Sequence, residues 1–179
     1  MEYFTYPWMD LFFEDDADKY RYAHLTEAIL FLPYGISVDA FQHVVYSKPD
    51  LSPQERKDAW REIEKKYLPS RKYDDNPYLE NGGWWQTQAH IFQSPFYYID
   101  YTLAQICAFQ FWQKARTDHE SAFQDYLTLC RAGGSMSFLE LVELADLRSP
   151  FEPGVLNDVM QDVTQWLNTV NADVYNVPA

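Results

Sequence analysis

The stretch SPQERKDAWREIEKKY, residues 52–67, carries the clearest structural signal in the sequence. Ser52 suits a helix N-cap, Pro53 suits the first helical position, and Glu55 stands where a capping box requires a glutamate. The apolar residues that follow recur on one face of a helix, at Ala59, Trp60, Ile63 and Tyr67. We therefore expect a helix that starts at Ser52 and stops before Pro69.

Helical spacing also occurs on the N-terminal side of this segment. Residues 16–32 place apolar side chains on one face, until Pro33 and Gly35 interrupt the pattern. Ser37 can cap a second helix, whose apolar spacing continues to the break at Pro49. The sequence thus predicts two helices here, separated at the proline and the glycine.

Four further helical segments are expected on the C-terminal side. They are an apolar segment from Pro95 to Lys114, a segment from Asp118 or His119 to Arg131 that Gly133 and Gly134 end, and shorter segments at 137–145 and 155–170. The stretch 72–83, rich in Asp, Asn, Pro and Gly, predicts a loop. No stretch alternates with period two, so we expect one all-α domain over residues 1–170 and a flexible tail at 171–179.

The first thirteen residues are strongly apolar and aromatic for the start of a chain. This stretch holds Tyr3, Phe4, Trp8, Leu11 and Phe12, and no capping residue or polar segment precedes them. We expect the sequence to begin inside a helix of a longer protein, because unpaired N–H groups and uncovered rings would otherwise result. The alternative is that the segment simply packs beneath the other helices.

Composition narrows the classes of partner. The 179 residues are 47% hydrophobic and 18% aromatic, which suits a folded core. Lys and Arg number 14 against 27 Asp and Glu, and the net charge of -13 disfavours nucleic acid and anionic membrane surfaces as partners.

Cys107 and Cys130 belong to no CxxC pair or Cys/His cluster, so reduced thiols are expected. With no basic N-terminal region and no apolar run near the roughly 18 residues of a membrane span, a cytoplasmic location is expected.

One stretch combines several side chains that can donate hydrogen bonds to a developing negative charge. It holds His90 and, after Pro95, the tyrosines Tyr97, Tyr98 and Tyr101. In a helix that begins near Pro95, Tyr98 and Tyr101 share a face, and Tyr97 is a neighbour of Tyr101. Phenol and imidazole groups can stabilise a tetrahedral oxyanion in this way. On spacing alone, an ordinary aromatic helix face with its hydroxyls at the surface is the stronger interpretation.

Two other polar groups give weaker signals. Asp39 and His43 are four residues apart and can pair or hold a metal, but two ligands make a weak site. The acidic run at 14–16 lacks the glycine and the terminal glutamate of a calcium loop, and it suits a helix N-terminus better.

Five blocks of sequence carry a resemblance to a known family. They are HIFQSPFYYIDYTLAQ at 90–105, LPYGISVDAFQH at 32–43, KKYLP at 65–69, LCRAGGS at 129–135 and LELVELA at 139–145. The first resembles the His…Pro-Phe-Tyr…Tyr segment of oligoendopeptidase F and its Pz-peptidase-like relatives, and the others resemble the same family in the same order. The chain is thus similar, from about Met1 to Leu167, to the C-terminal part of the catalytic region of the thimet oligopeptidase and oligoendopeptidase F family.

This resemblance implies a mostly helical, zincin-like bowl with a deep internal channel, of which the chain would be the C-terminal helical subdomain. It implies one zinc ion in the complete enzyme, held by an HExxH helix and a downstream glutamate. This sequence has no HExxH motif. The opening MEYFTYPW, residues 1–8, is similar to the family helix directly after the third ligand, which is therefore expected about two helical turns before Met1.

The resemblance also assigns roles to individual residues. His90, Tyr98 and Tyr101 match the family positions that stabilise the tetrahedral intermediate, and are the expected catalytic residues of this chain. His90 and Tyr97 are the expected substrate-binding residues, for short peptides in the complete enzyme. No metal ligand is assigned to this chain.

Two functional hypotheses follow. In the first, the chain is a C-terminal fragment of a zinc oligoendopeptidase, is inactive alone, and has the missing N-terminal part of the catalytic domain as its partner. In the second, it is a non-enzymatic binding or complementing subunit that docks on a chain bearing HExxH. A structural role for an acidic, stand-alone protein is a third, simpler interpretation.

Overall fold

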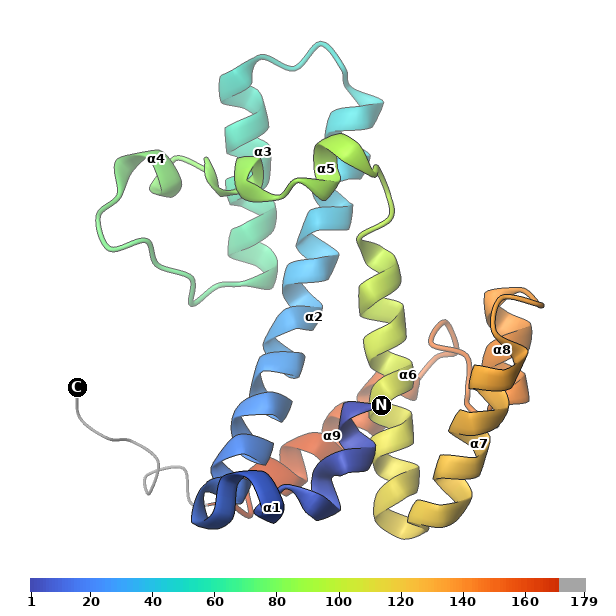
Figure 1. Ribbon diagram of the computed structural model, residues 1–179. Helices are drawn as coiled ribbons and strands as arrows, with labels where there is room; N and C mark the ends of the chain where they lie inside the picture. Colours follow the sequence, from blue (N-terminus) through green and yellow to red (C-terminus); the bar gives the residue numbers. More distant parts are fainter. Residues whose placement is uncertain (171–179) are drawn as a thin grey trace. The chain divides into compact units, whose positions relative to one another are not determined.

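The computed structural model of the protein describes residues 1–170, and every regular element among them is helical (Figure 1). The elements are η1 (Glu2–Trp8), α1 (Asp10–Phe13), η2 (Glu14–Asp16), α2 (Ala17–Ser47), α3 (Pro53–Tyr67), α4 (Pro77–Glu80), η3 (Trp84–Thr87), α5 (His90–Gln93), α6 (Ile99–Thr117), α7 (His119–Ala132), α8 (Phe138–Leu144) and α9 (Val155–Leu167). The expected all-α class is confirmed. The tail predicted at 171–179 lies outside the described residues.

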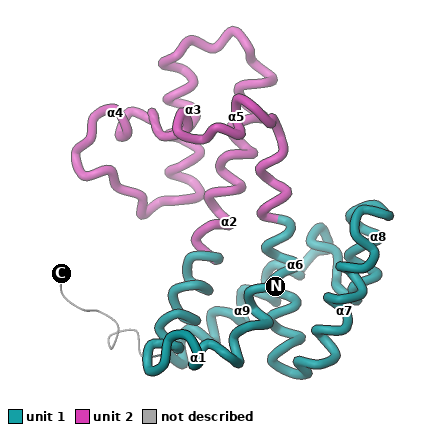
Figure 2. Tube along the Cα trace, viewed as in Figure 1, with its two compact units in different colours: residues 1–28, 103–179 teal, residues 29–102 magenta. Residues whose placement is uncertain are grey.

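The chain divides into two compact units, shown in different colours in Figure 2. Unit 2 is the continuous stretch 29–102. Among the described residues, unit 1 combines residues 1–28 with residues 103–170. The two crossings between the units fall inside α2 and α6, so each of these helices contributes residues to both units.

Helices with local start and stop signals follow the sequence closely. Ser52 caps α3 by accepting from the backbone N–H of Glu55 at 3.3 Å, and the Glu55 carboxylate accepts from the Ser52 N–H at 2.7 Å. The predicted capping box is thus present. Asp118 caps α7, and Gly133, with a φ of 54°, ends it in a conformation that glycine adopts at low cost.

The predicted break at Pro33 and Gly35 is wrong, because α2 continues through both residues as one helix. The Ser37 hydroxyl donates to the Pro33 carbonyl at 2.8 Å. Gly35 lies against α6, and a Cβ built on it would come 2.1 Å from Oγ1 of Thr102. The packing of α2 against α6 at this point therefore outweighs the tendency of Pro33 and Gly35 to break a helix.

Two other boundaries also differ from the sequence expectations. The helix expected from Pro95 begins instead at Ile99, because the preceding turn holds Phe96 at a φ of 61°, outside the helical range. The loop expected at 72–83 contains the short helix α4, capped by the side chain of Asn76. An asparagine followed by proline is itself a helix start, and this signal was overlooked within the polar stretch.

Unit 2 has an aromatic core beneath α2, α3, η3 and α5. Its buried members are Val38, Phe41, Trp60, Trp85 and Ile91. Phe41 meets Trp60 edge-on at 5.4 Å and packs on Trp85 at 5.0 Å. Tyr34 and Tyr98 pack at the margin of this core, so its rings support the region in which the sequence predicts a site.

Unit 1 buries part of the N-terminal segment. Tyr3 and Phe4 are buried, and the Tyr3 ring stacks on Phe109 at 5.8 Å, whereas Trp8, Leu11 and Phe12 remain exposed. The His119 Nε2 atom lies 3.0 Å from the Phe4 carbonyl oxygen. The segment thus packs on other helices of unit 1 and still leaves several apolar side chains exposed.

The helical stretch Asp10–Ser47 contains an 18-residue window with a mean hydropathy of 1.3, of which 33% is buried. By length and composition alone it passes the test for a membrane span, so the expectation that no apolar run approaches this length needs correction. One such helix is weak evidence for a membrane, because the core helix of a soluble protein passes the same test.

Candidate active-site wall

Four side chains named from the sequence lie together in unit 2. The His90 ring centroid is 5.0 Å from that of Tyr98, 5.8 Å from Tyr101 and 6.3 Å from Tyr97. Tyr101 in turn lies 5.3 Å from Tyr97 and 5.5 Å from Tyr98. We call these four residues the His–Tyr cluster. The fold therefore brings three phenols and one imidazole into a single group.

Each member is placed by the end of a helix. His90 is the first residue of α5, Tyr101 lies in the first turn of α6, and Tyr97 and Tyr98 belong to the turn between them. This turn is anchored at Phe96, whose backbone N–H donates to Oε1 of the buried Gln42 at 2.7 Å. A fixed turn allows two consecutive tyrosines to pack near one histidine.

Two residues that the sequence analysis did not name complete the surroundings of His90. Nε2 of Gln88 lies 2.6 Å from Nδ1 of His90, and Oε1 of the same amide accepts from the Tyr34 hydroxyl at 2.9 Å. The Tyr34 ring also meets Tyr98 edge-on at 6.0 Å. Tyr34 belongs to the LPYG block of the family resemblance, which was the available signal, whereas nothing in the sequence pattern marks Gln88.

The phenols of this region are held in their protonated form. Burial raises the pKa of Tyr98 to about 12, with smaller contributions from Tyr34 and Tyr101. Burial also raises the pKa of Tyr34. A hydrogen bond with Tyr97 is the main cause of the raised pKa of Tyr101. These tyrosines therefore retain their O–H donors throughout the neutral range.

The exposure of the cluster suits contact with a ligand. Tyr97 and Tyr101 are 47% and 41% exposed, and Tyr98 and His90 are half-buried. Protonated phenols and an imidazole N–H can all donate to an oxygen that gains negative charge. The same residues could equally bind the carbonyl groups of a peptide backbone.

Metal ligands are not assembled in the part of the chain that the structure describes. Over residues 1–170 no group of three or more His, Cys, Asp or Glu is placed to hold a metal ion. Asp39 and His43 form the predicted pair, with 3.4 Å between the carboxylate and Nε2, but they remain two groups. These two residues do not fit a zinc site.

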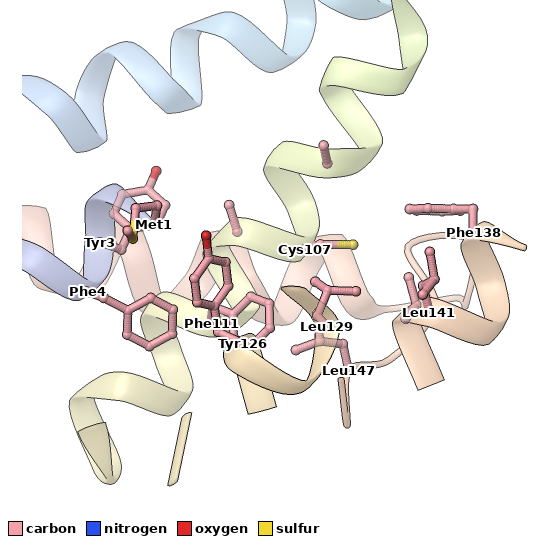
Figure 3. A pocket seen from close by; sticks show the side chains of 13 residues that line it. Met1, Tyr3, Phe4, Cys107, Phe111, Tyr126, Leu129, Phe138, Leu141 and Leu147 are labelled. Carbon is pink, nitrogen blue, oxygen red and sulfur yellow. The ribbon is translucent and has the colours of Figure 1, made fainter. Parts of the chain in front are cut away.

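A separate, apolar pocket of about 270 Å³ lies in unit 1 (Figure 3). Figure 3 shows Cys107 on α6 between the rings of Phe111 and Tyr126 and the side chains of Phe138 and Leu141. Burial raises the pKa of the Cys107 thiol to about 11, which leaves it unreactive as a nucleophile. Apart from the phenol groups of Tyr3 and Tyr126, the walls of this pocket are mainly apolar, so it suits apolar contact more than the binding of a reacting carbonyl.

The helical fold and the His–Tyr cluster together fit a segment of a peptide-hydrolysing enzyme, and comparison with protein families agrees. Residues 13–160 match the model of peptidase family M3, and the chain belongs to this family. Among curated protein sequences no match was found.

Three solved structures resemble the chain over 95% of its length. A protein assigned as an oligoendopeptidase F is 60% identical with a TM-score of 0.92, and Pz peptidase A, solved with an inhibitor, is 59% identical with a TM-score of 0.92. A protein assigned as an oligoendopeptidase F from Bacillus anthracis str. Ames is 54% identical with a TM-score of 0.79. The chain covers 30%, 30% and 27% of these three chains, so it spans less than a third of the solved structures that it matches.

Proposed function

We propose that this chain forms one wall of the active site of an oligoendopeptidase that cleaves short peptides. In this proposal Tyr98, Tyr101 and His90 donate hydrogen bonds to the oxygen of the scissile carbonyl as it gains charge, and Tyr97 and His90 bind the substrate backbone. The observation that carries the proposal is the grouping of three phenols around one imidazole in a chain of family M3.

The catalytic advantage of such a wall lies in its fixed donors. A donor that is already oriented stabilises the tetrahedral oxyanion more than the ground-state carbonyl, because it need not reorganise as charge develops. The Gln42 contact at Phe96 and the rings around Tyr34 supply the rigidity that this role requires. The residues act by position and hydrogen bonding, and none of them is consumed.

The proposal assigns the zinc-dependent part of the reaction to another part of the longer enzyme. The histidines of this sequence are His24, His43, His90 and His119, and no two are four residues apart as HExxH requires. Zinc, where bound, would polarise the carbonyl and activate water. We therefore expect the isolated chain to be inactive.

A cytoplasmic location remains part of the proposal.

The proposal is tested by mixing this chain with a separately produced fragment of a family M3 enzyme. That fragment bears HExxH and lacks the region that matches this chain. The chain alone should bind no stoichiometric zinc and hydrolyse no oligopeptide. The mixture should regain chelator-sensitive cleavage of a fluorogenic oligopeptide. Chelator-sensitive turnover by the chain alone would contradict the proposal.

A complementing or purely binding subunit is the second candidate. The exposed apolar residues of the N-terminal segment, Trp8, Leu11 and Phe12, favour a surface that another polypeptide covers. Co-elution of the two polypeptides without any regained cleavage would support this candidate over the first.

A further inference from the structure

We propose that Gln88 is a positioning residue, which holds the neutral His90 ring with its proton on Nε2 and so makes His90 a hydrogen-bond donor. This inference deepens the proposed function and rests on it for the role of the donated proton. The arrangement itself involves only Tyr34, Gln88 and His90, all within unit 2.

The Tyr34 hydroxyl fixes the orientation of the Gln88 side chain. Its pKa is raised by burial, so it keeps its proton, and that proton needs an acceptor. The acceptor is Oε1 of Gln88 at 2.9 Å. A carboxamide has its oxygen and its NH₂ group on opposite sides, so this contact directs Nε2 of Gln88 away from Tyr34.

The orientation of the Gln88 amide in turn decides which nitrogen of the His90 ring carries the proton. Nε2 of Gln88 lies 2.6 Å from Nδ1 of His90, and an NH₂ group can only donate. Nδ1 must therefore carry a lone pair, and the single proton of the neutral ring is on Nε2. Tyr34 thus controls the His90 tautomer through one intervening amide.

Nε2 of His90, on the other side of the ring from Gln88, is available to a ligand. Within residues 1–170 no hydrogen bond engages Nε2 of His90, although the rings of Tyr98 and Tyr101 lie 5.0 and 5.8 Å away. A protonated Nε2 can donate to a carbonyl oxygen next to the two phenols. With the opposite tautomer the ring would present a lone pair, which repels that oxygen.

Long-range 1H–15N spectra of this chain, labelled with 15N-histidine, test the assignment. The nitrogen shifts of the neutral His90 ring should show Nε2 protonated and Nδ1 free. In Gln88→Ala the ratio of the two tautomers should fall by about fivefold, as expected for the loss of one hydrogen bond. In Gln88→Glu the carboxylate can only accept, so the ratio of the two tautomers should reverse.

Tyr34→Phe provides a second route that leaves Gln88 in place. Without the hydroxyl the amide can rotate, so both tautomers should become populated. Gln93→Ala, an exposed glutamine three residues after His90, is the control and should leave the His90 shifts unchanged. Thermal unfolding of each variant identifies any that fail to fold.

A wild-type His90 ring protonated on Nδ1 would overturn the inference. So would nitrogen chemical shifts of the His90 ring that are unchanged in both Gln88→Ala and Tyr34→Phe. The spectra do not depend on peptidase activity. If they agree but His90→Ala leaves cleavage by the complemented enzyme unchanged, the proposed function fails and the tautomer assignment stands.

Discussion

The backbone N–H of Phe96 donates to the buried side-chain oxygen of Gln42 at 2.7 Å, although the two residues are 54 positions apart in the chain. This contact ties the turn before α6 to the C-terminal part of α2. Since Tyr97 and Tyr98 follow directly, the geometry of the His–Tyr cluster depends on a residue outside the cluster.

Gln42→Met should therefore loosen the turn while preserving the volume of the side chain. Removing the acceptor leaves a partly buried N–H unpaired, with an expected cost of about 1–3 kcal/mol in the free energy of unfolding. Urea denaturation measures this cost, and amide hydrogen exchange should accelerate at Phe96 and Tyr97. Gln54→Met, on the exposed side of α3, should change neither quantity.

Tyr98→Phe removes one donor from the proposed wall. In the complemented enzyme, kcat should fall about 100-fold, as for the loss of one oxyanion donor in other hydrolases. KM should change much less, because the interaction strengthens only in the transition state. Tyr67→Phe, on α3 outside the cluster, should behave as wild type, and equal losses in both variants would argue against a specific role.

Gly35→Ala probes the close approach of α2 to α6 within unit 2. An alanine normally favours a helix by about 1 kcal/mol relative to glycine. Here its Cβ would lie 2.1 Å from Oγ1 of Thr102, so we expect a net loss of about 1–3 kcal/mol from overpacking. Thermal or urea unfolding gives the value.

The double variant Gly35→Ala with Thr102→Ala is the matched control for this effect. The Thr102 hydroxyl is buried and makes no hydrogen bond within the described residues, so its removal sacrifices no partner. Stability should recover in the double variant. A double variant no more stable than Gly35→Ala alone would locate the cost elsewhere.

Alkaline pH should destabilise the chain through Tyr98. Its pKa is raised in the folded state from 10.0 to about 12, so the unfolded chain loses this proton first. The contribution of Tyr98 to the free energy of unfolding is complete below pH 10 and is lost as the pH rises towards about 12. Urea unfolding between these limits should show a falling free energy with a shallower slope in Tyr98→Phe, and equal slopes would show that Tyr98 titrates normally.

Local chemistry explains which helices were predictable. The capping box at Ser52 and the stop at Gly133 involve neighbours in sequence, and both helices appeared where expected. The continuity of α2 through Pro33 and the late start of α6 depend on contacts with Thr102 and Gln42, which are distant in sequence. Such contacts are invisible to a local pattern.

The candidate site shows the same division. His90 and the three tyrosines were accessible because they occupy one short stretch, and the structure brings them together. Tyr34 was missed because α2 delivers it from an earlier part of the chain, and Gln88 because a glutamine in a loop has no distinguishing pattern.

The division of the chain shown in Figure 2 has a consequence for the order of events during translation. Residues 29–102 form a continuous piece, so every contact inside unit 2 is available once that piece has left the ribosome. Unit 1 must wait, because residues 1–28 need helices encoded after residue 102. Until those emerge, Tyr3 and Phe4 lack the rings of Phe109 and Phe111 on which they pack, and transiently exposed apolar surface of this kind is what molecular chaperones bind.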